Sequence, residues 1–124
     1  MSLIGTIIGG IVLAVAGYFI LKLTLGWIMN KIDEYFSNKE TDAVNTKIDA
    51  TVVADIDEMM DKCQNRKSYE LLKKEREKGY THVMGKISGG KLTGDVDLVK
   101  DENDTLDPEV KTLLGPEKMV IIER

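Results

Sequence analysis

The sequence predicts an α+β fold: an N-terminal single transmembrane helix continuing into an amphipathic stalk, then helices and a small antiparallel or mixed β-sheet. Three patterns in the 124 residues support this prediction. A long uncharged run opens the chain, apolar residues at helical spacing follow it, and an alternation of period two comes later. The length excludes a multidomain enzyme and a polytopic transporter.

Charge divides the chain unequally. Residues 1–29 contain one charged side chain, Lys22, whereas the whole chain has 17 Lys and Arg against 21 Asp and Glu, a net charge of −4. We therefore expect three segments. They are a transmembrane helix with its amphipathic extension at 1–36, a linker or helix start at 37–46, and a small α+β soluble domain at 47–124.

The uncharged run is long enough to cross a bilayer. From Leu3 to Leu21 the chain has nineteen residues without a charge, and a helix of that length spans roughly 28 Å. Lipid cannot satisfy the backbone of an open strand, which favours a helix. A cleaved signal peptide is the competing interpretation, because Ala14-Val15-Ala16 has the spacing of a cleavage site. Against it, no Lys or Arg precedes the run, and the run continues past this point.

Basic residues predict the orientation of this helix. None precedes the apolar run, while Lys22 and Lys31 follow it closely. By the positive-inside rule we expect the N-terminus outside and the C-terminal domain in the cytoplasm, or the equivalent placement in a virion membrane. The single cysteine of the chain agrees with a reducing compartment.

Small residues gather on one side of the predicted transmembrane helix, which favours packing against other transmembrane helices of the same or another protein. These residues are Thr6, Gly9, Gly10, Ala14 and Gly17. The alternative is that glycine is simply common in such helices. Residues typical of a membrane interface come next, namely Lys22, Trp27, Lys31 and Tyr35.

Beyond this run, apolar residues recur at spacings of three and four, which is typical of an amphipathic helix. They are Leu21, Leu25, Ile28, Ile32 and Phe36. We interpret this segment as the same helix emerging from the bilayer as a stalk. Alternatively, the hydrophobic stretch runs to Met29 and tilts, with Lys22 facing a protein partner.

The next apolar residues also follow a helical period. From Val44 to Cys63 they step by three or four, which predicts an amphipathic helix of about five turns, with Thr41 as its N-cap. A short strand at Thr51-Val52-Val53 is the alternative. A further helix is predicted over 69–78, capped by Ser68 and ended by a glycine.

After residue 79 the period changes to two, which predicts a β-hairpin over 81–98 with its turn at Ser88-Gly89-Gly90. Asp107 is expected to cap a short helix that begins with Pro108. The final segment, 119–122, is apolar on both sides and predicts a strand that is central or covered by a helix.

No motif assigns a reaction. Residues 85–91 match the start of a phosphate-binding loop, but Leu92 stands where the motif needs Ser or Thr, and a strand follows instead of a helix. Seven acidic residues between 95 and 109 fit no calcium-binding loop and indicate a solvated loop. His82 has no second histidine for a zinc site. Cys63 lies on an apolar stripe, as a packed cysteine does.

These patterns predict a membrane-anchored structural or accessory protein that is not an enzyme and uses no cofactor or metal. Its expected partners are the lipid bilayer, other transmembrane helices and a soluble protein that docks on residues 47–124. The acidic balance disfavours nucleic acid. The alternative is a membrane-perturbing, holin-like or toxin protein. A membrane-tethered enzyme acting through His82 and the acidic loop at 95–109 has the least support, because no nucleophile, base and orienting group occur together.

Overall fold

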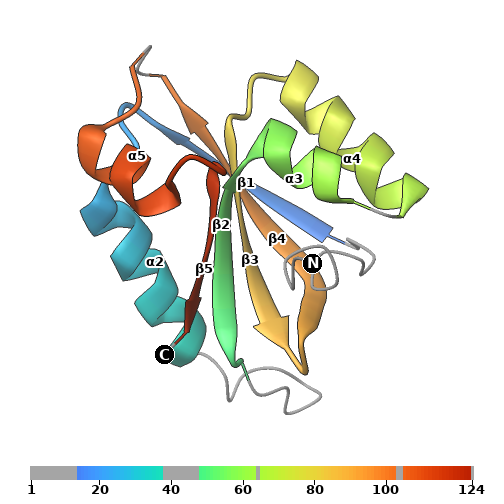
Figure 1. Cartoon of the computed structure of the whole chain (residues 1–124). Coiled ribbons are helices and arrows are strands. Elements are labelled where there is room, and N and C mark those ends of the chain that lie inside the picture. The colour runs from blue at the N-terminus through green and yellow to red at the C-terminus, as the bar shows by residue number, and fades with distance from the viewer. Residues whose placement is uncertain (1–13, 38–47, 64, 103–104, 124) are drawn as a thin grey trace.

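The structure is a computed structural model that describes residues 14–37, 48–63, 65–102 and 105–123. These residues form a five-stranded mixed sheet with helices on both faces, as Figure 1 shows. The elements are β1 (Ala14–Ile20), α2 (Leu25–Ser37), β2 (Ala50–Asp55), α3 (Ile56–Lys62), α4 (Arg66–Glu77), β3 (His82–Ser88), β4 (Lys91–Asp101), α5 (Pro108–Leu114) and β5 (Met119–Glu123).

The strands lie in the order β1-β4-β3-β2-β5. Neighbours are antiparallel except β1, which runs parallel to β4. Within the described part of the chain, β1 and β5 are therefore the two edges of the sheet.

The N-terminal segment corrects the predicted fold class. Residues Ala14–Ile20 form a strand, and no helix among the described residues has the length and apolar character needed to cross a membrane. The predicted transmembrane helix, the single-pass membrane localisation and the orientation derived from it are therefore wrong. The physical reason is that β-branched and aromatic residues such as Val15 and Tyr18 favour a strand, and β4 supplies the hydrogen-bond partners that the strand requires. The earlier part of the run, residues 3–13, lies outside the described residues.

A new helix, α2, starts after β1 because Thr24 caps it. The Thr24 hydroxyl accepts a hydrogen bond from the Trp27 backbone N–H at 3.1 Å. The predicted apolar stripe is indeed helical, and Ile28, Ile32 and Phe36 are buried. They pack on the sheet, so the interpretation of this helix as a stalk leaving a membrane is wrong.

The predicted helix between Val44 and Cys63 is wrong over its central part, where β2 lies. The alternative strand at Thr51–Val53 is confirmed. Only the last residues are helical, in α3, which begins where the Asp55 carboxylate accepts a hydrogen bond from the Asp57 backbone N–H at 2.8 Å. Thr41, the predicted cap, lies outside the described residues.

The elements predicted for the C-terminal half are confirmed, with shifted ends. Helix α4 starts earlier than expected, because Asn65 caps it by accepting a hydrogen bond from the Ser68 backbone N–H at 3.0 Å. The hairpin turn uses Gly89 and Gly90 at φ +60° and +79°, a backbone region that glycine enters without strain. Asp107 caps α5 as expected.

Strand β5 matches one of its two predicted placements. It is not central, because among the described residues it pairs with β2 alone and lies at an edge of the sheet, but α5 packs against it, as predicted for a strand covered by a helix. Its side chains are mostly half-buried because α5 and the neighbouring strand cover them only in part.

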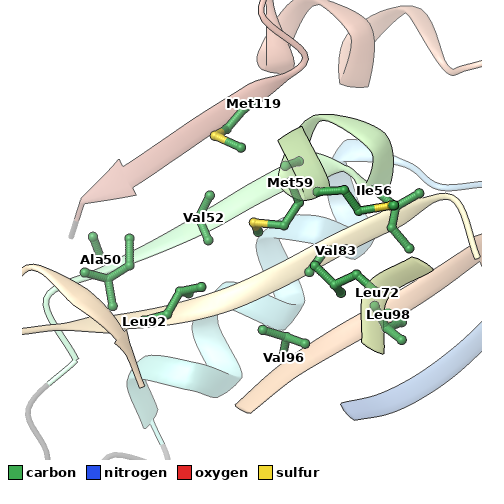
Figure 2. Packing of buried hydrophobic residues seen from close by; sticks show 13 residues of the cluster. Ala50, Val52, Ile56, Met59, Leu72, Val83, Leu92, Val96, Leu98 and Met119 are labelled. Carbon is green, nitrogen blue, oxygen red and sulfur yellow. The ribbon is translucent and has the colours of Figure 1, made fainter. Parts of the chain in front are cut away.

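Two hydrophobic layers hold the helices on the sheet, because alternate residues of each strand point to opposite faces. Helices α3 and α4 cover one face, and α2 and α5 cover the other (Figure 1). Figure 2 shows the first layer, in which Met59 and Leu72 of the helices lie against Val52, Val83 and Leu98 of the strands. Strand β1 contributes to both layers, so residues 14–37 share the core of the rest of the molecule.

Candidate functional site

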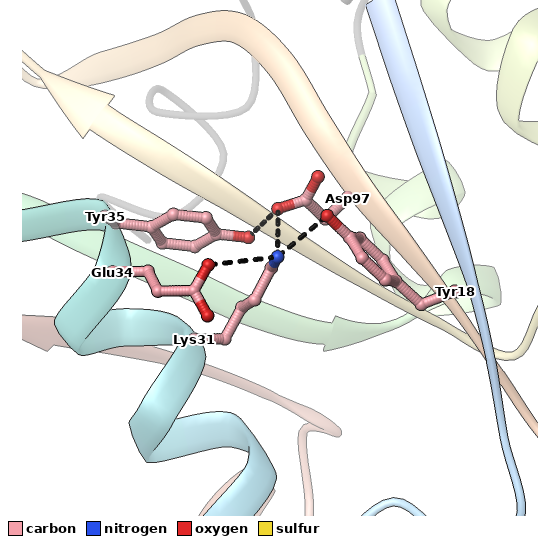
Figure 3. A network of polar contacts seen from close by, with 5 residues as sticks. All are labelled: Tyr18, Lys31, Glu34, Tyr35 and Asp97. Carbon is pink, nitrogen blue, oxygen red and sulfur yellow. Dashed lines mark hydrogen bonds and ion pairs between the residues drawn. The ribbon is translucent and has the colours of Figure 1, made fainter. Parts of the chain in front are cut away.

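A polar cluster lies between α2 and the sheet, centred on Lys31 (Figure 3). The Lys31 ammonium donates a hydrogen bond to the Tyr18 hydroxyl at 2.8 Å. Its nitrogen lies 3.6 Å from a Glu34 oxygen and 4.0 Å from an Asp97 oxygen. The Lys31 side chain is only 11% exposed, so the cluster ties α2 to both β1 and β4.

Tyr35 and Lys31, the proton-bearing groups of the cluster, both have raised pKa values. The Tyr35 hydroxyl donates to Asp97, and burial together with the Asp97 charge raises the pKa of Tyr35 far above its ordinary value. Burial is the largest single effect and lowers the pKa of Lys31, but the Tyr18 hydrogen bond and the charges of Asp97, Tyr18 and Glu34 together raise this pKa, so the net shift is upward. Neither group releases a proton near neutral pH, and the arrangement fits a structural clamp better than acid–base chemistry.

The residues predicted for a membrane interface are only partly brought together. Lys31 and Tyr35 meet in the polar cluster, and Trp27 packs edge-on against the Tyr18 ring at 5.9 Å between centroids. Lys22 lies apart, with its side chain 48% exposed, and forms an ion pair with Asp107 at 3.5 Å.

The residues predicted for helix–helix packing fall in two places. Thr6, Gly9 and Gly10 lie outside the described residues. Ala14 and Gly17 lie in β1, which is a strand.

Strand β1 presents an exposed apolar margin that we call the β1 edge surface. It comprises Ala16, Gly17, Phe19 and Leu21 together with the half-buried Tyr80. Phe19 is 67% exposed and Leu21 is 81% exposed. The Phe19 ring stacks on the Tyr80 ring, with centroids 5.6 Å apart and an interplanar angle of 12°.

Gly17 is what allows this stacking. The Tyr80 hydroxyl lies over the Gly17 backbone, at a place where a Cβ atom would overlap it. A larger residue at this position would push the Tyr80 ring away from the strand. Gly17, which the sequence predicted to pack against another helix, therefore leaves room for the Tyr80 ring.

No strand among the described residues pairs with the outer side of β1, so its outward backbone groups have no sheet partner within that part of the chain. The Ile20 carbonyl accepts a hydrogen bond from the backbone N–H of Glu102, in the segment that continues β4. The backbone groups of Ile20, and of every second residue before it in β1, therefore point toward β4. Successive residues of a strand point their N–H and C=O groups to opposite sides. Val15, Gly17 and Phe19 therefore direct theirs away from the sheet.

The two edges of the sheet differ in charge. Strand β5 includes Glu123 and follows Glu117 and Lys118, which are the kind of charged residues that protect exposed edges. No charged side chain occurs anywhere before Lys22. Within the described sheet, the edge of β1 can therefore pair with another strand, whereas the charged residues of β5 oppose such pairing.

Sequence reasoning missed Phe19, Tyr80 and Asp97. Each acquires its role from the pairing of β1 with β4 or from the approach of the segment before β3. No local spacing signals these contacts. The sequence shows that residues 14–21 are uncharged, but this absence of charge led to the prediction of a transmembrane helix.

Cys63 is half-buried against the core, and burial raises the pKa of its thiol, which makes it a poor nucleophile. The described residues contain no group of three or more His, Cys, Asp or Glu side chains that could hold a metal ion.

No protein-family model, curated protein or solved structure matches this chain.

Proposed function

We propose that this chain is a non-catalytic structural protein that assembles with a second copy of itself by antiparallel pairing of the two β1 edges. The observation that carries the proposal is the uncharged outer edge of β1, which no other described strand pairs with and which the exposed Phe19 and Leu21 flank. Pairing would satisfy the outward N–H and C=O groups of the strand and remove these side chains from water.

A second copy fits this edge because the edge complements itself. Two copies related by a twofold axis present the same strand to each other in opposite directions. Every acidic residue of the chain comes after residue 29, so no like charges meet within the paired strands. The stacked Phe19 and Tyr80 rings would flank the new pair of strands and add apolar contact.

The expected dimer is weak. Two paired strands of seven residues each bury less than the roughly 1,600 Å² of a standard interface. Dimerisation should therefore depend on protein concentration. It should respond little to salt, because no ion pair contributes to it.

Sedimentation equilibrium over a range of concentrations tests the proposal. We expect the unmodified chain to pass from monomer to dimer, and Ala16→Lys to remain monomeric because it places a charge on the edge. The matched control is Met29→Lys, which adds the same charge at a partly exposed apolar residue of α2 and should dimerise normally. A chain that stays monomeric, or an Ala16→Lys variant that dimerises like the control, would overturn the proposal.

A further inference from the structure

A pocket of about 360 Å³ opens at one end of the sheet, where β2 ends and where β3 and β5 begin. Its volume falls within the range of roughly 300 to 1,000 Å³ typical of small-molecule sites. Its apolar lining side chains are Leu106, Leu114 and Pro116. The rest includes His82, two lysines and an aspartate, none of which belongs to the β1 edge surface.

His82 is buried, and its ring orientation is fixed by Thr81. The Thr81 hydroxyl lies 2.8 Å from His82 Nδ1 and 3.2 Å from the Val99 carbonyl, and it accepts from the Asp101 backbone N–H at 3.4 Å. A hydroxyl has one proton to donate. All three contacts are satisfied when that proton goes to Val99 and His82 Nδ1–H donates to Thr81.

This arrangement leaves the lone pair on His82 Nε2. Burial lowers the pKa of His82, although the charges of Asp55 and Asp101 oppose the shift. The imidazole is therefore neutral at neutral pH, and Nε2 can accept a hydrogen bond from a bound molecule.

Two exposed lysines, Lys111 and Lys118, also line the pocket. Neither forms an ion pair with any residue that the structure describes. Asp55 is the acidic residue of the wall, and its carboxylate is already engaged by the Asp57 backbone N–H at 2.8 Å. The excess of uncompensated positive charge favours an anionic ligand.

Lys118 is held at the pocket in an unusual conformation. Its φ is +59°, a region that residues other than glycine rarely enter. Two backbone hydrogen bonds hold it there: the Lys118 carbonyl accepts from the Asp55 N–H at 3.0 Å, and the Lys118 N–H donates to the Gly115 carbonyl at 3.1 Å. Such a residue at a pocket is often functional.

We propose that this pocket binds a small organic acid. Its apolar body lies against Leu106, Leu114 and Pro116, its carboxylate faces Lys111 and Lys118, and a donor group on the ligand hydrogen-bonds His82 Nε2. The proposal is independent of assembly through β1.

The test uses the only histidine of the chain, whose Cε1–H signal in an NMR spectrum reports on the pocket without assignment. The full chain is titrated with 4-hydroxybenzoate, which has an apolar ring, a carboxylate and a hydroxyl donor. We expect a saturable shift of the His82 signal. Two probes serve as controls: 4-hydroxybenzamide lacks the charge, and inorganic phosphate lacks the apolar body. Each should bind about tenfold more weakly, the equivalent of one lost charge contact or apolar contact.

Matched lysine variants locate the anion. Lys111→Gln and Lys118→Gln should each weaken 4-hydroxybenzoate binding about threefold, as expected for partly solvated charges. Lys91→Gln changes an exposed lysine at the hairpin turn and should have no effect. The proposal is overturned by the absence of a saturable shift, by equal binding of 4-hydroxybenzamide, or by equal affinities of the three variants. The remaining spectrum shows whether each variant is folded.

Discussion

Two threonine hydroxyls, those of Thr51 and Thr81, differ in their hydrogen bonding. Thr51 is fully buried, and its hydroxyl has no hydrogen-bond partner within the described structure. Thr81 uses its hydroxyl in three contacts around His82. A buried polar group without a partner costs stability, whereas a satisfied one contributes to it.

This contrast predicts opposite effects of the same substitution. Thr51→Val should raise the free energy of unfolding by about 1 kcal/mol, because the methyl group needs no partner. Thr81→Val should lower it by about 1 kcal/mol or more. Urea unfolding of both variants gives the two values, and a loss of stability in Thr51→Val would show that its hydroxyl has a partner.

His82 predicts a dependence of stability on pH. Its pKa is lowered from 6.5 in the folded chain, mainly by burial. As the pH falls through 6.5, the unfolded chain binds the proton first, so the free energy of unfolding falls until the pH passes the folded-state pKa. Above this pH range His82 is neutral in both the folded and the unfolded chain, so it does not change the free energy of unfolding.

Comparing urea unfolding at about pH 7.5 and about pH 5.5 tests this sign. The unmodified chain should lose more stability than His82→Gln between the two conditions. Other groups titrate equally in both chains, so the difference isolates the histidine. Equal losses would mean that His82 is not buried in its neutral form.

At the scale of elements, helix α2 depends on the polar cluster as well as on its apolar face. Removing the Lys31 ammonium would leave Asp97, whose side chain is 17% exposed, without its positive partner. We expect Lys31→Met to lower the free energy of unfolding by about 2 kcal/mol. Lys22→Met, which breaks a half-exposed ion pair, should cost less than about 0.5 kcal/mol. Equal effects in urea unfolding would show that the cluster contributes no more than a surface pair.

The elements also show what local sequence could predict. Helix α4, the hairpin and α5 were predicted because their signals are local: cap residues, alternation, and glycine or proline at the ends. The sequence predicts a helix for β1, and for β2 a helix with a short strand as the alternative, because apolar residues spaced by three or four, or uninterrupted, fit a helix as well as a buried strand. These segments form strands because they pair with strands that are distant in the sequence.

The candidate sites were predictable only in part. Lys31 and Tyr35 were predicted as membrane-interface residues, whereas in the structure they meet in a polar cluster with Asp97, which lies more than sixty positions away from Tyr35 in the sequence. His82 had the least support as a catalytic residue, because the chain has no second histidine for a zinc site and no nucleophile, base and orienting group occur together in the sequence. Its pocket is assembled from the ends of separate strands and from α5.

At the scale of the whole molecule, the layered arrangement explains where an interaction surface can lie. Helices cover both faces of the sheet, so contact with another strand is left to the edges. One edge carries charges and the other carries none before Lys22. Assembly through β1 follows from this asymmetry.

Hydrogen exchange of the β1 amides at low and high protein concentration tests this account most directly. Ala16, Tyr18 and Ile20, which face β4, should be protected at both concentrations, whereas Val15, Gly17 and Phe19 should gain protection only at high concentration. Uniform protection of all six would indicate a helix, and an alternating pattern that ignores concentration would indicate an edge that does not pair. Either result would contradict the proposed assembly.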